Sequence, residues 1–119
     1  MRRLLTVFAL LLALALPIAL RAQQKESPVR TVHGQVVDKD GNNLPNAVVQ
    51  LRNLKTQAIR SYISDDAGEY RFSGLDPNID YEIHAETTDM TSTPHKITSF
   101  DTRREIDLPI RVDKKKTGK

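Results

Sequence analysis

The sequence predicts an all-β fold, and three observations lead to this prediction. Short runs of residues alternate between apolar and polar side chains, which is the period-two pattern of half-buried strands. Gly, Asp, Asn and Pro residues separate these runs at the short intervals typical of turns between antiparallel strands. After Ala22 no stretch has the apolar spacing that an amphipathic helix requires. We therefore expect an antiparallel β-sandwich of about seven strands in two face-to-face sheets.

The first 22 residues have the features of a secretory signal peptide. Arg2 and Arg3 precede an apolar run from Leu4 to Leu20, and the small residue Ala22 stands before a polar stretch. We expect an apolar signal helix over residues 1–22 that is cleaved after Ala22 and touches the membrane only in transit. The mature protein would then be exported, to the periplasm or the extracellular space. The alternative is an uncleaved segment that anchors the protein in the membrane, because the run approaches the roughly 20 apolar residues that span a bilayer.

The remaining residues suffice for one domain. We expect a polar linker over residues 23–28, the β-sandwich over residues 29–113, and a basic disordered tail over residues 114–119. The sequence contains no cysteine, so the domain has no disulfide bond and depends on its hydrophobic core for stability.

The charge of the folded part argues against a nucleic-acid partner. The chain has 18 Lys+Arg against 15 Asp+Glu, which gives a net charge of +3. Removing Arg2, Arg3 and Arg21 of the signal and the four lysines of the tail from the 18 basic residues leaves 11 of them against the 15 acidic ones. Because the folded part is acidic, we expect it not to bind nucleic acid.

The first two strands are expected on either side of a polar turn. Val29 to Val37 form the first strand, and Gly34 marks a point where another backbone approaches or the strand bends. Asp38 to Asn43 form the turn, because Asp and Asn bond to their own backbone and Gly and Asn tolerate a positive φ. Ala47 to Leu51 alternate again and form the second strand.

The middle of the chain continues the same pattern. A third strand is expected over Ala58 to Ser64, and Asp65 to Gly68 are expected to close a hairpin into the strand Glu69 to Phe72. The alternation fails over Thr87 to Pro94, which we interpret as a long surface loop, and a strand resumes over His95 to Phe100. The aromatic side chains assigned to the core are Tyr70, Phe72 and Tyr81.

The last strand shows the clearest alternation. Its apolar residues are Ile106, Leu108, Ile110 and Val112. Pro109 lies among them and has no N–H group to donate to a neighbouring strand. We therefore expect this strand at a sheet edge, or with the Pro109 position turned outward.

A series of motifs between residues 32 and 75 points to a known family. The motifs are Gly34-Gln35-Val36, the turn Asp38 to Gly41, Pro45-Asn46-Ala47-Val48-Val49, the segment Asp65 to Phe72, and Gly74-Leu75. In order and spacing they resemble the carboxypeptidase regulatory-like domain, a small β-sandwich related in architecture to transthyretin (prealbumin). The resemblance implies an exported, non-enzymatic accessory or interaction module whose partner is an envelope or extracellular protein. The matched residues are turn and core positions, so the resemblance transfers no binding site.

The polar residues offer no catalytic, cofactor-binding or metal-binding set. His33, His84 and His95 lack the close spacing that preorganises metal ligands. The acidic run that begins at Asp38 starts like a calcium loop but lacks its later ligands, and Asp65 lies in a turn where a carboxylate stays ionised. A transthyretin-like hydrolase is a less favoured alternative, because the Tyr-Arg-Gly-Ser ending of those enzymes is absent. We expect no catalytic residue, no cofactor and no metal.

Carbohydrate binding is the alternative function, because related sandwiches bind glycans and sugar rings stack on exposed aromatic side chains. Tyr62 is the candidate ligand-binding residue. We expect Ile59 and Ile63 to occupy the buried face of their strand, which would leave the Tyr62 ring outside. A glycan is therefore the second kind of partner to consider.

Overall fold

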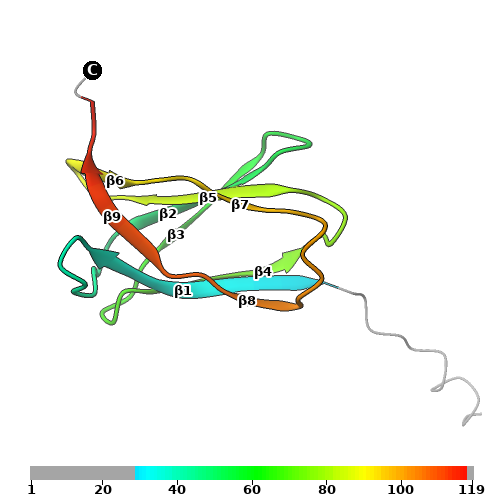
Figure 1. Ribbon diagram of the computed structural model, residues 1–119, viewed down its shortest axis with the longest axis horizontal. Helices are drawn as coiled ribbons and strands as arrows, with labels where there is room; N and C mark the ends of the chain where they lie inside the picture. Colours follow the sequence, from blue (N-terminus) through cyan, green and yellow to red (C-terminus); the bar gives the residue numbers. More distant parts are fainter. Residues whose placement is uncertain (1–28, 118–119) are drawn as a thin grey trace, which may run out of the picture.

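The computed structural model describes residues 29–117, a stretch that is built of strands and turns (Figure 1). The strands in these residues are β1 (Arg30–Asp38), β2 (Val48–Asn53), β3 (Ile59–Ile63), β4 (Glu69–Leu75), β5 (Tyr81–Glu86), β6 (Met90–Ser92), β7 (His95–Ile97), β8 (Glu105–Asp107) and β9 (Ile110–Lys115). Residues 29–117 include no helix with the length and apolarity needed to cross a membrane. The signal helix expected over residues 1–22 and the linker expected over residues 23–28 lie outside the described residues.

The strands form two layers that meet along β1 (Figure 1). The first layer consists of β4, β1 and β8, and the second consists of β3, β2, β5 and β9 with the short strands β6 and β7. The beginning of β1 pairs with β4 and β8, whereas Val36 to Asp38 at its end pair with β9. The predicted all-β sandwich is confirmed. The predicted number of strands is too low, because the described residues contain nine.

The prediction of a purely antiparallel sandwich is wrong in one place. β1 runs parallel to both β8 and β9, while the other pairs of named strands are antiparallel. The chain returns to β1 more than once: β4 pairs with it in the antiparallel direction, and β8 and β9, which follow β5, β6 and β7, pair with it in the parallel direction. The period-two pattern gives the buried face of a strand but not the direction of its neighbour.

The predicted last strand is divided where it passes Gly34. β8 ends at Asp107 and β9 begins at Ile110, so Leu108 and Pro109 lie between them. A Cβ atom on Gly34 would lie only 2.2 Å from the backbone carbonyl oxygen of Leu108. This confirms that Gly34 is a point of close backbone approach. Pro109 lies at the break between the two strands, where it need not donate a ladder hydrogen bond.

The core lies between the layers and is made of the inward-facing residues of nearly every strand. Its buried members are Val32, Val36, Ala47, Val49, Leu51, Tyr70, Phe72, Leu75, Tyr81, Ile83, Ala85, Ile97, Ile106, Ile110 and Val112. The assignment of Tyr70, Phe72 and Tyr81 to the core is thus confirmed. Burial raises the pKa of Tyr70, and its hydroxyl group donates a hydrogen bond of 2.6 Å to the carbonyl of Leu108. This hydrogen bond ties β4 to the break between β8 and β9.

The hairpin predicted at Asp65 to Gly68 is instead a connection between the two layers. β3 pairs with β2, and β4 pairs with β1, so the two strands on either side of the turn are not each other's partners. The local turn chemistry is nevertheless as predicted. The carboxylate of Asp65 accepts hydrogen bonds from the backbone N–H groups of Ala67 and Glu69 at 3.0 and 2.9 Å.

Two segments expected to be irregular contain strand residues. The loop predicted over Thr87 to Pro94 includes β6, where Ser92 is buried and its hydroxyl accepts a hydrogen bond from the N–H of Ala85. The disordered tail predicted from residue 114 begins too early, because Lys114 and Lys115 belong to β9 and pair with β6. In both segments, pairing of the backbone with a neighbouring strand overrides the polar composition.

Candidate functional site

A groove of about 590 Å³ lies over the outer face of the first layer. We call it the outer groove. Besides two tyrosines and Asp65 of the turn before β4, its polar lining residues are His33 and Gln35 from β1, Glu69 and Arg71 from β4, and Asp107 from β8. The five side chains on these strands point away from the core, because they alternate with the buried residues of the same strands. The outer groove therefore presents a polar surface on the rigid part of the fold.

Strand pairing decides which polar side chains lie side by side across the outer groove. His33 lies opposite Arg71 on β4 and opposite Asp107 on β8. Arg71 also forms an ion pair of 3.4 Å with Glu105, but both side chains are more than half exposed, so the pair adds little to stability. The lining includes no serine, threonine or cysteine. It offers hydrogen-bond donors and acceptors to a polar ligand, without a hydroxyl or thiol nucleophile of those kinds.

Tyr62 lies on β3 at the rim of the outer groove. Its ring packs against the Phe72 ring in a T-shaped arrangement with a centroid distance of 6.0 Å, and 39% of the residue is exposed. Tyr62 lies opposite the buried residue Val49, so it is on the inner face of its strand. The expectation that Ile59 and Ile63 are buried is wrong, because they are 58% and 63% exposed. Tyr62 is accessible because β3 is the last strand of its layer.

The edge of β3 is the second exposed feature of the described residues. We call the strand Ile59–Ile63, with the backbone groups that do not face β2, the β3 edge. All of its residues are exposed, and β2 is its only strand partner within residues 29–117. An open apolar edge of this kind is a template for pairing with another strand. The sequence carries one signal of this edge. Apolar side chains occur on both faces of the strand, with Ile59 and Ile63 on one face and Tyr62 on the other, so one face had to stay exposed or bind a partner.

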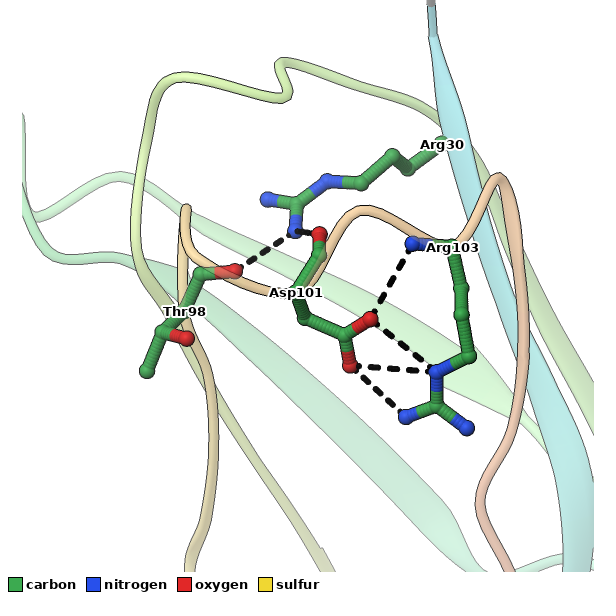
Figure 2. Close-up of polar contacts among 4 residues, drawn as sticks. All are labelled: Arg30, Thr98, Asp101 and Arg103. Carbon is green, nitrogen blue, oxygen red and sulfur yellow. Dashed lines mark hydrogen bonds and ion pairs between the residues drawn. The ribbon is translucent and has the colours of Figure 1, made fainter.

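A buried arginine at the start of β1 joins the loops at one end of the sandwich. Arg30 is 2% exposed. Its guanidinium group donates hydrogen bonds to the backbone carbonyls of Thr98 (2.7 Å), Asp101 (3.2 Å), Asp76 (3.1 Å) and Ile79 (2.9 Å). Figure 2 shows the guanidinium group directed at the β7–β8 loop. Arg30 thus connects the β4–β5 and β7–β8 loops and serves the structure rather than an exposed site.

An ion pair on the outside of the β7–β8 loop completes this cluster (Figure 2). Arg103 donates to the carboxylate of Asp101 through its guanidinium group, with a shortest distance of 2.7 Å, and through its backbone N–H. These hydrogen bonds, with the charges of Arg103 and Arg30, lower the pKa of Asp101 to about 2. Asp101 therefore stays ionised and orients the loop whose carbonyl groups Arg30 binds.

The other residues considered as ligands serve turns or lie apart. The carboxylate of Asp38 accepts hydrogen bonds from the backbone N–H groups of Asp40 and Asn42, both at 2.9 Å, and the bond from Asn42 is the main cause of its lowered pKa. This is the turn that the sequence predicts. The three histidines lie on three strands, β1, β5 and β7. In residues 29–117 no group of three or more His, Cys, Asp or Glu residues is placed to hold a metal ion.

Comparison with known sequences gives one family. The sequence model of the carboxypeptidase regulatory-like domain matches residues 31–111. No curated protein matches the chain in sequence.

Solved structures resemble the chain in fold. A catechol 1,2-dioxygenase from Acinetobacter superposes with a TM-score of 0.54 at 13% identity, over 77% of this chain and 54% of the enzyme. A streptococcal ancillary pilin gives 0.56 at 15% identity, over 76% of this chain and 34% of the pilin. The major pilin subunit of Bacillus cereus gives 0.56 at 15% identity, over 71% and 30%. The chain spans about half of the dioxygenase and about a third of each pilin, and at these identities the likeness shows the fold alone.

Proposed function

The chain belongs to the carboxypeptidase regulatory-like domain family, and we propose that it is an exported, non-enzymatic accessory module that binds an envelope or extracellular protein. The observation that carries this proposal is the open β3 edge, in which Ile59 and Ile63 expose more than half of their surface. An exposed apolar edge strand accepts an extended segment of another protein by β-strand addition. We infer that the β3 edge is the contact surface.

Three further features support the proposal. The first 22 residues favour export, with cleavage after Ala22 or retention as a membrane anchor as the two routes. The outer groove has no serine, threonine or cysteine in its lining, and the Asp65 carboxylate is already bound by backbone N–H groups. Two proteins of similar fold are pilins by their names, one an ancillary pilin and the other a major pilin subunit, which fits an interaction role for such a sandwich.

Photo-crosslinking in the producing cells tests this function. We expect a photoreactive phenylalanine analogue at Ile63 to give an adduct with one envelope protein, identified by mass spectrometry, in the exported fraction. The matched control is the same analogue at Lys39, an exposed residue in the turn after β1, which should give no such adduct. Equal adducts at the two positions, no adduct at Ile63, or a chain confined to the cytoplasm would contradict the proposal.

Carbohydrate binding is the second candidate, and the position of Tyr62 beside the outer groove favours it. A sugar ring that stacks on Tyr62 would place its hydroxyl groups near Glu69, Arg71 and Asp107. An aromatic platform next to charged hydrogen-bonding side chains is the kind of surface that holds a polyhydroxylated ligand.

A glycan array followed by titration tests this candidate. We expect Tyr62→Ala to weaken binding of the selected glycan by about tenfold, because the stacking surface is lost. Tyr62→Phe should keep the affinity. Phe100→Ala is the matched control, since Phe100 is 90% exposed but does not line the outer groove. If Tyr62→Ala binds as well as the wild type, or if Phe100→Ala loses as much, the groove is not a glycan site.

A further inference from the structure

The hydrogen bonds at the two ends of β3 show which of its backbone groups are free. The carbonyl of Ala58 accepts from Asn53, and the N–H of Ser64 donates to Ala47, both at 2.9 Å. Backbone groups alternate in direction along an antiparallel strand, so the even-numbered residues of β3 face β2. The odd-numbered residues direct their N–H and C=O groups toward the open side. These residues are Ile59, Ser61 and Ile63.

The residues of the β3 edge that carry the free backbone groups are arranged symmetrically about Ser61. The sequence of the edge is Ile-Arg-Ser-Tyr-Ile, with one isoleucine two residues away on each side of Ser61. If two copies meet in antiparallel fashion about a two-fold axis at Ser61, Ile59 of each copy lies opposite Ile63 of the other. Ser61 then lies opposite its own counterpart. All the opposed residues in these pairs carry the free backbone groups, so each pair can exchange hydrogen bonds between the copies.

The side chains match in the same register. Each Ile59 would contact an Ile63 on the outer face, which covers both exposed isoleucines of the strand. On the inner face, Arg60 would lie opposite Tyr62 of the other copy. The Arg60 guanidinium already lies 5.5 Å from the centre of the Phe72 ring, so Tyr62 of the second copy would extend the same aromatic surface.

Other registers fit less well. A shift of two residues in one direction places Arg60 opposite Arg60, and like charges directly opposite each other destabilise a pair of strands. The opposite shift places Tyr62 opposite Tyr62 and leaves Ile59 beyond the paired edge. A shift of one residue places the residues with free backbone groups opposite residues whose backbone groups already bond to β2, so the hydrogen bonds between the copies cannot form. The register centred on Ser61 is the one that satisfies backbone and side chains together.

We propose that the partner of the β3 edge is a second copy of this chain, paired antiparallel about a two-fold axis at Ser61. The inference rests on the proposed function, in which the β3 edge is the contact surface, and it names the occupant. The second layers of the two copies become one continuous sheet. Tyr62 of each copy lies next to the axis, so the dimer brings the rims of both outer grooves together.

Sedimentation of variants with introduced charges in the analytical ultracentrifuge tests the proposal on the whole protein. We expect the wild type to show a monomer–dimer equilibrium. The double variant Ile59→Lys with Ile63→Lys should have a dimer dissociation constant more than about tenfold higher than that of the wild type, because each lysine lies opposite a lysine of the other copy. The double variant with Glu at both positions should also be monomeric. Mixing the Lys and Glu variants should restore a dimer that contains one of each, since every contact then joins opposite charges.

A single cysteine tests the register. The chain has no cysteine, so oxidation of Ser61→Cys should give a disulfide-linked dimer, whereas Ser73→Cys on β4 should stay monomeric. A wild type that is monomeric at all concentrations, or a dimer that the lysines leave unchanged, would overturn the proposal. If the dimer proposal fails but Ile63 crosslinks to a different envelope protein, the proposed function still stands. If no adduct forms at Ile63, the proposed function fails together with the dimer proposal.

Discussion

Arg30→Met is expected to lower the free energy of unfolding by about 3 kcal/mol. Met fills much of the same space but cannot donate hydrogen bonds. The buried guanidinium group binds four backbone carbonyls, those of Asp76, Ile79, Thr98 and Asp101. Without it, carbonyls of the β4–β5 and β7–β8 loops lose their partner, and a buried acceptor without a partner costs about 1–3 kcal/mol. Urea denaturation monitored by circular dichroism measures the change.

Two controls separate the role of hydrogen bonding from that of charge and size. Arg30→Lys keeps the positive charge, but one ammonium group cannot reproduce the planar fork that reaches both loops, so an intermediate loss is expected. Arg104→Met makes the same substitution at an exposed residue of the β7–β8 loop and should change stability by less than about 0.5 kcal/mol. If Arg30→Met is as stable as Arg104→Met, the guanidinium group does not hold the loops.

The sequence predicted the faces of the strands well because burial leaves a local pattern. Apolar residues stand at every other position at Ala47, Val49 and Leu51, in and just before β2, and at Tyr70 and Phe72 in β4, and these side chains are buried. Turns were equally local. The carboxylates of Asp38 and Asp65 accept hydrogen bonds from backbone groups two and four residues further along, so their own sequence neighbourhood specifies the turn.

Strand neighbours were not predictable from the same pattern. The parallel pairing of β1 with β8 and β9 joins segments that lie far apart in the sequence. Alternation is identical for parallel and antiparallel edges, and it cannot tell a hairpin from a connection between layers, as at Asp65 to Gly68. One long-range contact could nevertheless be predicted from the sequence. Gly34 interrupts an alternating strand, and a glycine there indicates the close approach of another backbone.

The candidate site depended on the part of the pattern that was hardest to interpret. β3 has apolar residues on both faces, with Ile59 and Ile63 on one and Tyr62 on the other, so the sequence did not fix which face is buried. Pairing with β2 decides it, because Tyr62 lies opposite the buried Val49. Arg30 was missed although it shares the inward face with Val32, because a buried arginine is rare without a partner and its partners here are carbonyls of distant loops.

Gly34→Ala is expected to lower the free energy of unfolding by about 3 kcal/mol or more, since the added methyl group meets backbone atoms that cannot move freely. Its Cβ would lie 2.2 Å from the carbonyl oxygen of Leu108 and 3.1 Å from the nitrogen of Pro109. Leu108 is held from two sides: its N–H donates to His33 at 2.8 Å, and its carbonyl accepts from Tyr70 at 2.6 Å. Relief of the clash must therefore break one of these bonds or move β1.

Gly74→Ala is the matched control, because the two glycines differ in the cause of strain. Gly74 has a φ of +72° but nothing within 4 Å of an added Cβ, so the same substitution there costs about 1–2 kcal/mol of backbone strain and no clash. Tyr70→Phe supplies a second readout. If Gly34→Ala displaces Leu108, its hydrogen bond with the Tyr70 hydroxyl is already lost, and adding Tyr70→Phe should cost less than it does in the wild type. Two outcomes would contradict this prediction: losses in the free energy of unfolding that simply add in the double variant, or a Gly34→Ala variant that is more stable than Gly74→Ala. Either outcome would mean that β8 and β9 can move away from β1 without a loss of stability.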